Sequence, residues 1–170
     1  MIRDMTILGS NALAWALEHE GSTSYATRCL AFVEDAIERA NGLEILGGDD
    51  AAESARLYDA SIHTDAPPIH ALAFYESVGE LFGVRRDWGH VGLSLGDGRV
   101  VHAWDRVRID HYRALESLTP APGWEPMRWV GWTPLTRVME GASPRDWDEN
   151  AVDAAARMQA ERFGSGFRMP

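Results

Sequence analysis

The segment WGHVGLSLGDGRVVHAWD, residues 88–105, carries His90 and His102 on either side of a glycine-rich turn at residues 96–98. Both flanks of this turn are rich in valine and leucine, a pattern that predicts a β-hairpin. Side chains alternate between the two faces of a strand, so the register of the hairpin decides whether the two histidines share a face.

Two lengths of the hairpin loop give opposite arrangements of the two histidines. A two-residue turn pairs Leu93 with His102, which separates the histidines and buries His102 among apolar side chains. A three-residue loop at residues 96–98 pairs Gly92 with His102 and leaves His90 diagonal to it on the same face, at about 7 Å. The longer loop also collects the apolar side chains on the opposite face: Val91, Leu93, Val101 and Ala103. Because a slip of one residue would reverse every side chain, the pattern favours the three-residue loop.

The chain has one cysteine, Cys29, in the segment SYATRCLAFVEDAIERAN at residues 24–41. A helix is expected over residues 27–40, with Cys29 at its second or third position. Backbone N–H groups and the helix dipole at that end, with Arg28 alongside, favour the thiolate and predict a lowered pKa. A buried, unreactive cysteine is the alternative, and a histidine within reach would favour catalysis over it.

These residues combine into a candidate site in which Cys29 is a nucleophile, His90 its base and His102 the residue that orients His90. The same three side chains also have the ligand count of a zinc site. That alternative is weaker because the set lacks a closely spaced ligand pair. No metal and no cofactor is therefore predicted.

Helical patterns come first along the chain and strand patterns later, which predicts an α+β fold with an antiparallel sheet. One domain is expected over residues 1–170, with its core at about 11–140. The expected helices lie at residues 11–20, 27–40, one or two turns within 47–60, and an additional C-terminal helix at 144–163 with Ser143 as its N-cap. Strands are expected at residues 69–76, on both sides of the turn, and at 127–135.

The bulk composition excludes several classes of protein. With 170 residues, 45% hydrophobic and 25% charged, the chain has the composition of an ordinary globular domain. Its net charge of -10 argues against a nucleic-acid partner. No apolar run is long enough to span a membrane, and the start lacks the features of a signal peptide. All 16 basic residues are arginines, which excludes a lysine nucleophile.

Three segments together resemble the NlpC-type cell-wall peptidases, the NlpC and p-sixty family of papain-like cysteine peptidases. They are HVGLSLGDGRVVHA at residues 90–103, RCLAFVEDA at 28–36 and PPIHALAFYES at 67–77. The resemblance covers about residues 13–135, and RCLAFVED is also similar to the related CHAP amidases. It implies a papain-like fold with a nucleophile at a helix N-terminus, packed on an antiparallel sheet.

The resemblance also implies a chemistry and a substrate. Cys29 matches the family's nucleophile, His90 its general base and His102 the third, orienting residue. The family transfers an acyl group to water without a cofactor, and its substrates are the D-γ-glutamyl bonds of peptidoglycan stem peptides. The backbone N–H of Cys29 would contribute to the oxyanion hole.

The cysteine segment departs from the family pattern, which is usually Asp-Cys-Ser-Gly. Arg28 and Leu30 flank the cysteine here, and the family's upstream tyrosine is replaced by Leu17, for which Tyr25 is a candidate substitute. An arginine beside the nucleophile repels an ammonium group and suits a carboxylate. We therefore expect a substrate without a free amine at that subsite.

Two tryptophans, Trp88 and Trp104, flank the hairpin and are expected either to wall a substrate groove or to be buried in the core. With Arg28 and Tyr25 they complete the predicted substrate-binding set. The expected function is a cysteine hydrolase acting on an amide, most of all in peptidoglycan. The alternatives are a non-catalytic binding module of the same fold, and a thiol hydrolase or toxin acting on a non-wall amide.

The resemblance places this activity in the cell envelope or outside the cell. The chain's own start shows no signal peptide, which leaves a cytoplasmic origin or a non-Sec export route open. The sequence does not predict an oligomeric state.

Overall fold

The computed structural model describes residues 4–147, which form an α+β fold, as the order of patterns along the chain predicts. The helices are α1 Met5–Glu18, α2 Cys29–Asn41, α3 Ala51–Leu57 and α4 Leu135–Val138, with short 3-10 helices η1 Ala60–Ile62 and η2 Ala114–Ser117. The strands are β1 Leu43–Glu44, β2 Leu72–Glu76, β3 Val78–Leu81, β4 Val84–Asp87, β5 His90–Ser94, β6 Arg99–Ala103, β7 Val107–His111, β8 Arg128–Thr133 and β9 Ser143–Pro144.

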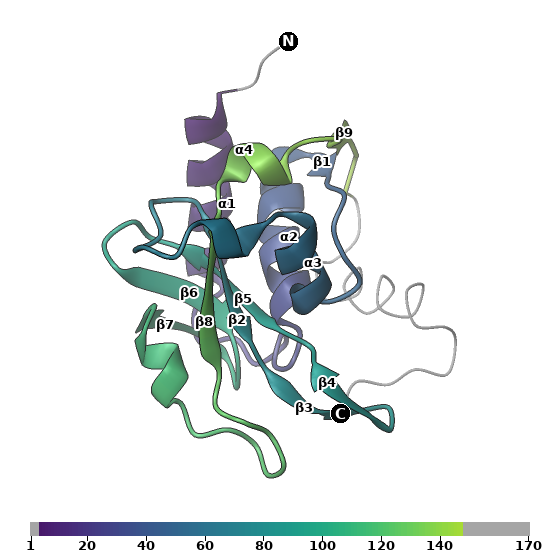
Figure 1. The fold of residues 1–170 in the computed structure, drawn as a ribbon. Coiled ribbons are helices and arrows are strands. Elements are labelled where there is room, and N and C mark those ends of the chain that lie inside the picture. Colours follow the sequence, from purple (N-terminus) through teal and green to yellow (C-terminus); the bar gives the residue numbers. More distant parts are fainter. Residues whose placement is uncertain (1–3, 148–170) are drawn as a thin grey trace.

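A five-stranded sheet in the order β7-β6-β5-β2-β8 forms the centre of the molecule (Figure 1). All of its neighbouring strands pair antiparallel, which confirms the predicted sheet type. Two smaller two-stranded sheets, β1-β9 and β3-β4, lie outside it. The β5-β6 hairpin, which carries the two histidines, is therefore central in the sheet and flanked by a paired strand on each side.

The hairpin has the predicted three-residue loop. Gly92 pairs with His102, and the N–H of Leu95 donates to the carbonyl of Arg99 over 2.9 Å. Gly96 and Gly98 adopt φ values of 84° and 91°, which side chains rarely tolerate. The register thus places His90 and His102 on one face of the sheet, as the hydrophobic pattern predicts.

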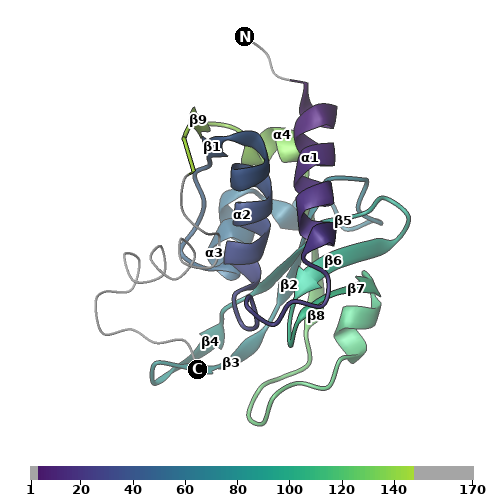
Figure 2. The ribbon, with the colours of Figure 1, turned by 180° about the vertical axis from the view of Figure 1, so that it is seen from behind.

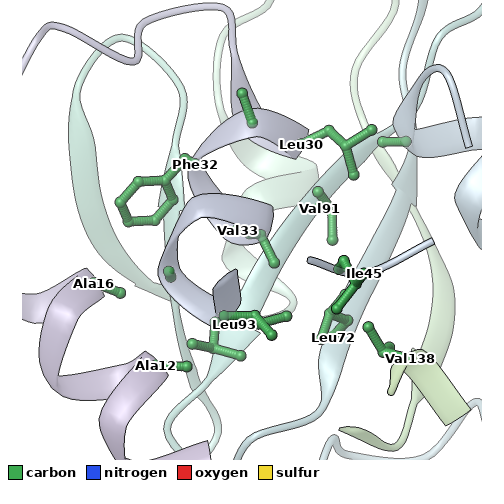
Figure 3. Packing of buried hydrophobic residues seen from close by; sticks show 14 of the residues in the cluster. Ala12, Ala16, Leu30, Phe32, Val33, Ile45, Leu72, Val91, Leu93 and Val138 are labelled. Carbon is green, nitrogen blue, oxygen red and sulfur yellow. The ribbon is translucent and has the colours of Figure 1, made fainter. Parts of the chain in front are cut away.

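Helix α2 covers the opposite, apolar face and contacts β5 and β6. It ends at Gly42, whose left-handed conformation (φ 63°) is the C-cap that the Asn41-Gly42 pair predicts. Figure 3 shows Leu30 and Val33 of α2 directed toward Val91 of β5 within the core. Helix α1 packs along α2, and both lie in front of the sheet in Figure 2.

The β3-β4 hairpin was not predicted from the sequence. It projects beyond the end of the main sheet in Figures 1 and 2. Its two-residue turn has positive φ at both Phe82 (55°) and Gly83 (75°), the geometry of a type I′ turn. Phenylalanine is rare in this conformation, so the sequence lacks the usual turn signal.

The structure also corrects two predicted helices. The first helix begins at Met5, capped by the Asp4 side chain, well before residue 11. Ser143 is not a helix N-cap: Ser143–Pro144 forms strand β9 on β1, and the N–H of Arg145 donates to Gly42. The remainder of the predicted C-terminal helix, from residue 148 onward, lies outside the described residues.

Within residues 4–147, no helix has both the length and the apolar character needed to cross a membrane.

Several carboxylates of α2 are buried in the fold. Glu34, Asp35 and Glu38 are each at most 2% exposed. One oxygen of Glu38 accepts the N–H of Ile45. Burial, followed by the negative charge of Glu34, raises the pKa of Glu38 to about 8, so this side chain is protonated at neutral pH.

We expect Glu38→Gln to flatten the pH dependence of stability between about pH 5 and 8. In this window the unfolded chain has lost the Glu38 proton and the native chain retains it. Wild-type stability therefore falls as pH rises through this window, by at most about 1.4 kcal/mol per pH unit from this group. Glutamine cannot titrate, yet it keeps an acceptor for Ile45. Urea unfolding at several pH values measures the slope.

The matched control is Glu140→Gln, which changes a glutamate that is 67% exposed and should leave the wild-type slope intact. Parallel stability curves for the wild type and Glu38→Gln would contradict a protonated Glu38.

Candidate active site

Cys29 is the first residue of α2, and the backbone N–H of Val91 in β5 acts on its thiol. The chain turns at Thr27, whose N–H donates to the carbonyl of Trp104 over 3.2 Å and ties the helix start to the end of β6. The backbone N–H groups of Val91, Leu30 and Cys29 itself lie near the sulfur and lower the pKa of the thiol. Since Val91 follows His90 directly, the sulfur lies beside the histidine strand.

Cys29 and His90 line one cavity of about 660 Å³. Cys29 is half-buried and His90 is 5% exposed, so both residues are largely shielded from bulk solvent. The predicted nucleophile and the predicted base therefore line the same cavity. The cavity provides the access that a substrate would need.

The two histidines form a direct pair. His90 Nε2 lies 2.8 Å from His102 Nδ1, with the rings nearly perpendicular at 85°. His102 is fully buried behind His90, as the predicted orienting residue should be. Gly92, opposite His102, makes room for it: a Cβ at position 92 would lie 3.1 Å from the His102 Cβ.

Asp110, on the neighbouring strand β7, extends the histidine pair into a hydrogen-bonded chain of three side chains. The sequence did not predict this residue. Its carboxylate accepts a hydrogen bond from His102 Nε2 at 2.8 Å and from Arg108 Nε at 2.7 Å. The bond from His102, then that from Arg108, lowers the pKa of Asp110 to about 2. The alternation VRIDH in β7 could have revealed it, because Arg108 and Asp110 share a face there.

The ionised carboxylate of Asp110 fixes the proton positions in both rings. A carboxylate only accepts hydrogen bonds, so His102 Nε2 must carry a proton. In neutral His102, Nδ1 is then an acceptor, and His90 Nε2 must donate to it. His90 Nδ1 is consequently left with a free lone pair, which is the state of a general base.

Burial keeps both rings neutral. It lowers the pKa of His90 well below its usual value, and the neighbouring His102 adds to this effect. It also lowers the pKa of His102, although the hydrogen bond and charge of Asp110 oppose this. Near pH 7 each ring therefore carries one N–H proton and no charge.

The predicted lowering of the Cys29 pKa is wrong. Burial raises the pKa of the thiol to about 11, and the charge of Asp50 also raises it. The backbone N–H groups of Val91, Leu30 and Cys29 lower the pKa, as the helix-start argument requires, but burial outweighs them. The resting site therefore holds a thiol and a neutral imidazole.

Three of the four predicted substrate-binding residues line the cavity: Arg28, Trp88 and Trp104. Tyr25 does not, which corrects the prediction for this residue. Its side chain is fully buried and its hydroxyl donates to Asp35 over 2.7 Å. Tyr25 therefore stabilises the packing of α2 and has no access to a ligand in the cavity.

The zinc alternative does not fit the ring geometry. Histidine nitrogens bind zinc through their lone pairs at about 2.0–2.1 Å. Here the facing nitrogens of His90 and His102 are hydrogen-bonded to each other, and the far nitrogen of His102 is bonded to Asp110. Across the described part of the chain, no group of three or more His, Cys, Asp or Glu side chains could hold a metal ion.

Comparison with models of known protein families finds no match to this chain. Comparison with curated protein sequences finds no match either. The assignment of the site therefore rests on its own residues and on the resemblance of the quoted segments.

We expect the alkylation of native Cys29 by iodoacetamide to rise with pH up to about 11, without a plateau near neutrality. A thiol with this pKa holds at least about 100-fold less thiolate at pH 7 than the same cysteine in the unfolded chain. Mass spectrometry gives the rate directly, because the chain has a single cysteine. The urea-unfolded protein is the control. A plateau below pH 8 would instead indicate a preformed thiolate–imidazolium pair.

We expect Asp110→Asn to lower the pKa of His102 further, because it removes the hydrogen bond and charge that oppose burial. An NMR titration of the ring signals measures this shift. Asp105→Asn is the matched control, since Asp105 is exposed and its charge is the smallest contribution named for His102. Equal shifts in the two variants would contradict the direct bond between Asp110 and His102.

Proposed function

We propose that this protein is a papain-like cysteine hydrolase that cleaves an amide bond. The observation that carries the proposal is the chain Asp110–His102–His90, which ends in the cavity lined by Cys29. Cys29 is the nucleophile, His90 the general base and His102 the orienting residue. Asp110 is a positioning residue that acts through His102.

In the proposed reaction His90 Nδ1 takes the thiol proton as Cys29 Sγ attacks the amide carbonyl. The proton moves during the attack because the resting thiol is not ionised. The imidazolium then protonates the leaving amine, and a water molecule, deprotonated by His90, releases the acyl group as a carboxylic acid. The backbone N–H of Cys29, at the start of α2, is a donor for the developing oxyanion.

Peptide amides of peptidoglycan are the first substrate to test, because the resemblance to NlpC-type peptidases implies them. Action in the cell envelope or outside the cell belongs to this proposal. Incubation with purified muropeptides, followed by mass analysis, would reveal a cleaved stem peptide. An unchanged product profile would exclude these substrates for the protein.

A non-wall amide is the second candidate, and the composition of the cavity favours it. The lining of the cavity includes Phe82, Trp88 and Trp124. Such walls suit an apolar group better than the carboxylates of a stem peptide. A non-catalytic binding module on the same scaffold would bind such ligands without any turnover.

We expect Cys29→Ala and His90→Ala to abolish hydrolysis, because they remove the nucleophile and the base. His102→Asn should retain partial turnover, since an amide oxygen can still accept from His90 Nε2. Initial rates on the cleaved amide measure the three effects, and circular dichroism confirms that each variant is folded. Wild-type turnover in Cys29→Ala would remove the nucleophile assignment.

A further inference from the structure

The cavity beside Cys29 has an apolar wall built from two segments far apart in the sequence. One is the β3-β4 hairpin with the residues that follow it, and the other is the loop at residues 118–127 that precedes β8. Together with the end of β6 they supply the large apolar side chains of the wall: Leu81, Phe82, Trp88, Trp104, Trp124 and Met127.

Gly79 of β3 joins the two segments. The Trp124 ring lies so close to the Gly79 backbone that an added Cβ would overlap it at 2.0 Å. The carbonyl of the same glycine accepts Nε1–H of Trp88 over 3.1 Å. Both indoles are therefore positioned by one backbone unit, and any side chain at position 79 would displace Trp124.

Further bonds hold the two segments in place. The N–H of Glu125 donates to the carbonyl of Val78 over 2.9 Å, and Arg85 donates to the carbonyl of Gly123 over 2.8 Å. The wall is thus formed before any ligand arrives. A preformed aromatic surface binds an apolar group without first having to order its own side chains.

Phe82 extends this wall at the turn of the hairpin. Its ring meets the Trp88 ring edge-on, with centroids 5.8 Å apart, and the residue is 47% exposed. Arg86 covers Trp88 at 3.8 Å while it forms an ion pair with Asp50. The arginine charge near this wall is therefore already matched by a carboxylate.

The charges around the cavity oppose an anionic ligand. Four exposed acidic residues line it: Asp49, Glu80, Asp105 and Glu125, of which Asp105 forms ion pairs with Arg106 and Arg108. Arg28 is the one arginine among the described residues that line the cavity, and the other basic residue, His90, is neutral. We call these acidic residues the acidic rim of the cavity. A carboxylate that approaches the rim meets electrostatic repulsion, whereas a neutral group does not.

We propose that the cavity binds a neutral aromatic group of the substrate, next to the bond that Cys29 attacks. This inference rests on the proposed function, and it names the substrate class of the same site. The aromatic wall gains contact and apolar burial from such a group. The acidic rim selects against a carboxylate-bearing group in its place.

Three iodoacetamides with the same reactive carbon test this inference. They are iodoacetamide, N-benzyl iodoacetamide and N-carboxymethyl iodoacetamide, reacted with the full chain at pH 9. In each reaction the Cys29 sulfur bonds to the methylene carbon, the carbon–iodine bond breaks, iodide leaves and the thiol proton passes to the buffer. The single cysteine makes the mass shift unambiguous.

We expect the benzyl reagent to show saturation and to react at least about tenfold faster than iodoacetamide, the scale of discrimination in an apolar pocket. The carboxymethyl reagent should react more slowly than iodoacetamide. Phe82→Asn should reduce the benzyl preference, because asparagine tolerates the left-handed conformation of this turn and removes the ring. Val84→Thr is the matched control on the same hairpin: Val84 is exposed and does not line the cavity.

Equal, unsaturated rates for the three reagents would overturn the inference, and so would a carboxymethyl reagent faster than the benzyl one. Loss of the benzyl preference in Val84→Thr, but not in Phe82→Asn, would also overturn it. Alkylation requires no hydrolysis, so the two proposals fail separately. A benzyl preference in a protein that cleaves neither a muropeptide nor an aromatic amide would support the aromatic site and remove the hydrolase assignment.

Discussion

The hydrogen bond between His90 Nε2 and His102 Nδ1 is the contact on which the proposed chemistry depends. It exists because the β5-β6 loop has three residues, with glycines at positions 96 and 98 in left-handed conformations. A loop shorter by one residue would turn His102 to the other face of the sheet. The apolar residues that pack against α2 therefore also fix the position of the rings, since one register satisfies both faces.

Burial of the two rings and the hydrogen bonds to Asp110 together give this hydrogen-bonded chain a definite protonation state. Asp110 is ionised while His90 and His102 are neutral, and a neutral ring pair bonded to a carboxylate has one consistent arrangement of protons. The same burial keeps the thiol of Cys29 protonated. In a site of this kind the resting cysteine is a thiol. The nucleophilic thiolate would form only when a substrate carbonyl approaches and the thiol proton passes to His90. Such a cysteine would react slowly with ordinary alkylating reagents near neutral pH and still be competent in catalysis.

The sequence predicted the parts of the structure that depend on local patterns. Alternation across residues 88–105 was sufficient for the histidine register, and Asn41-Gly42 marked the end of α2. Tertiary contacts determined what was missed. Ser143 and Pro144 carry a helix-start signature, but Trp147 donates to the carbonyl of Leu43 and its ring lies 4.0 Å from the Arg145 guanidinium, which favours pairing with β1. The pKa of Cys29 was wrong for a related reason: the helix start was visible in the sequence, whereas the enclosure around the sulfur was not.

The proposed chemistry and the proposed recognition depend on different parts of this fold. The hydrogen-bonded chain is built on the main sheet: His90 and His102 lie on β5 and β6, which pair on both sides, and Asp110 lies on the edge strand β7. The aromatic wall is built on a peripheral hairpin and a loop, which meet at Gly79. Substitutions in these peripheral segments can change the shape of the cavity without altering the register of the histidines, because no strand of the main sheet passes through them. The departures of Arg28 and Leu30 from the NlpC-type pattern are consistent with this division, since they lie on the cavity side of the nucleophile and leave the His90–His102 pair untouched. A resemblance carried by the histidine hairpin therefore bears on the reaction, whereas the substrate has to be inferred from the wall and the rim.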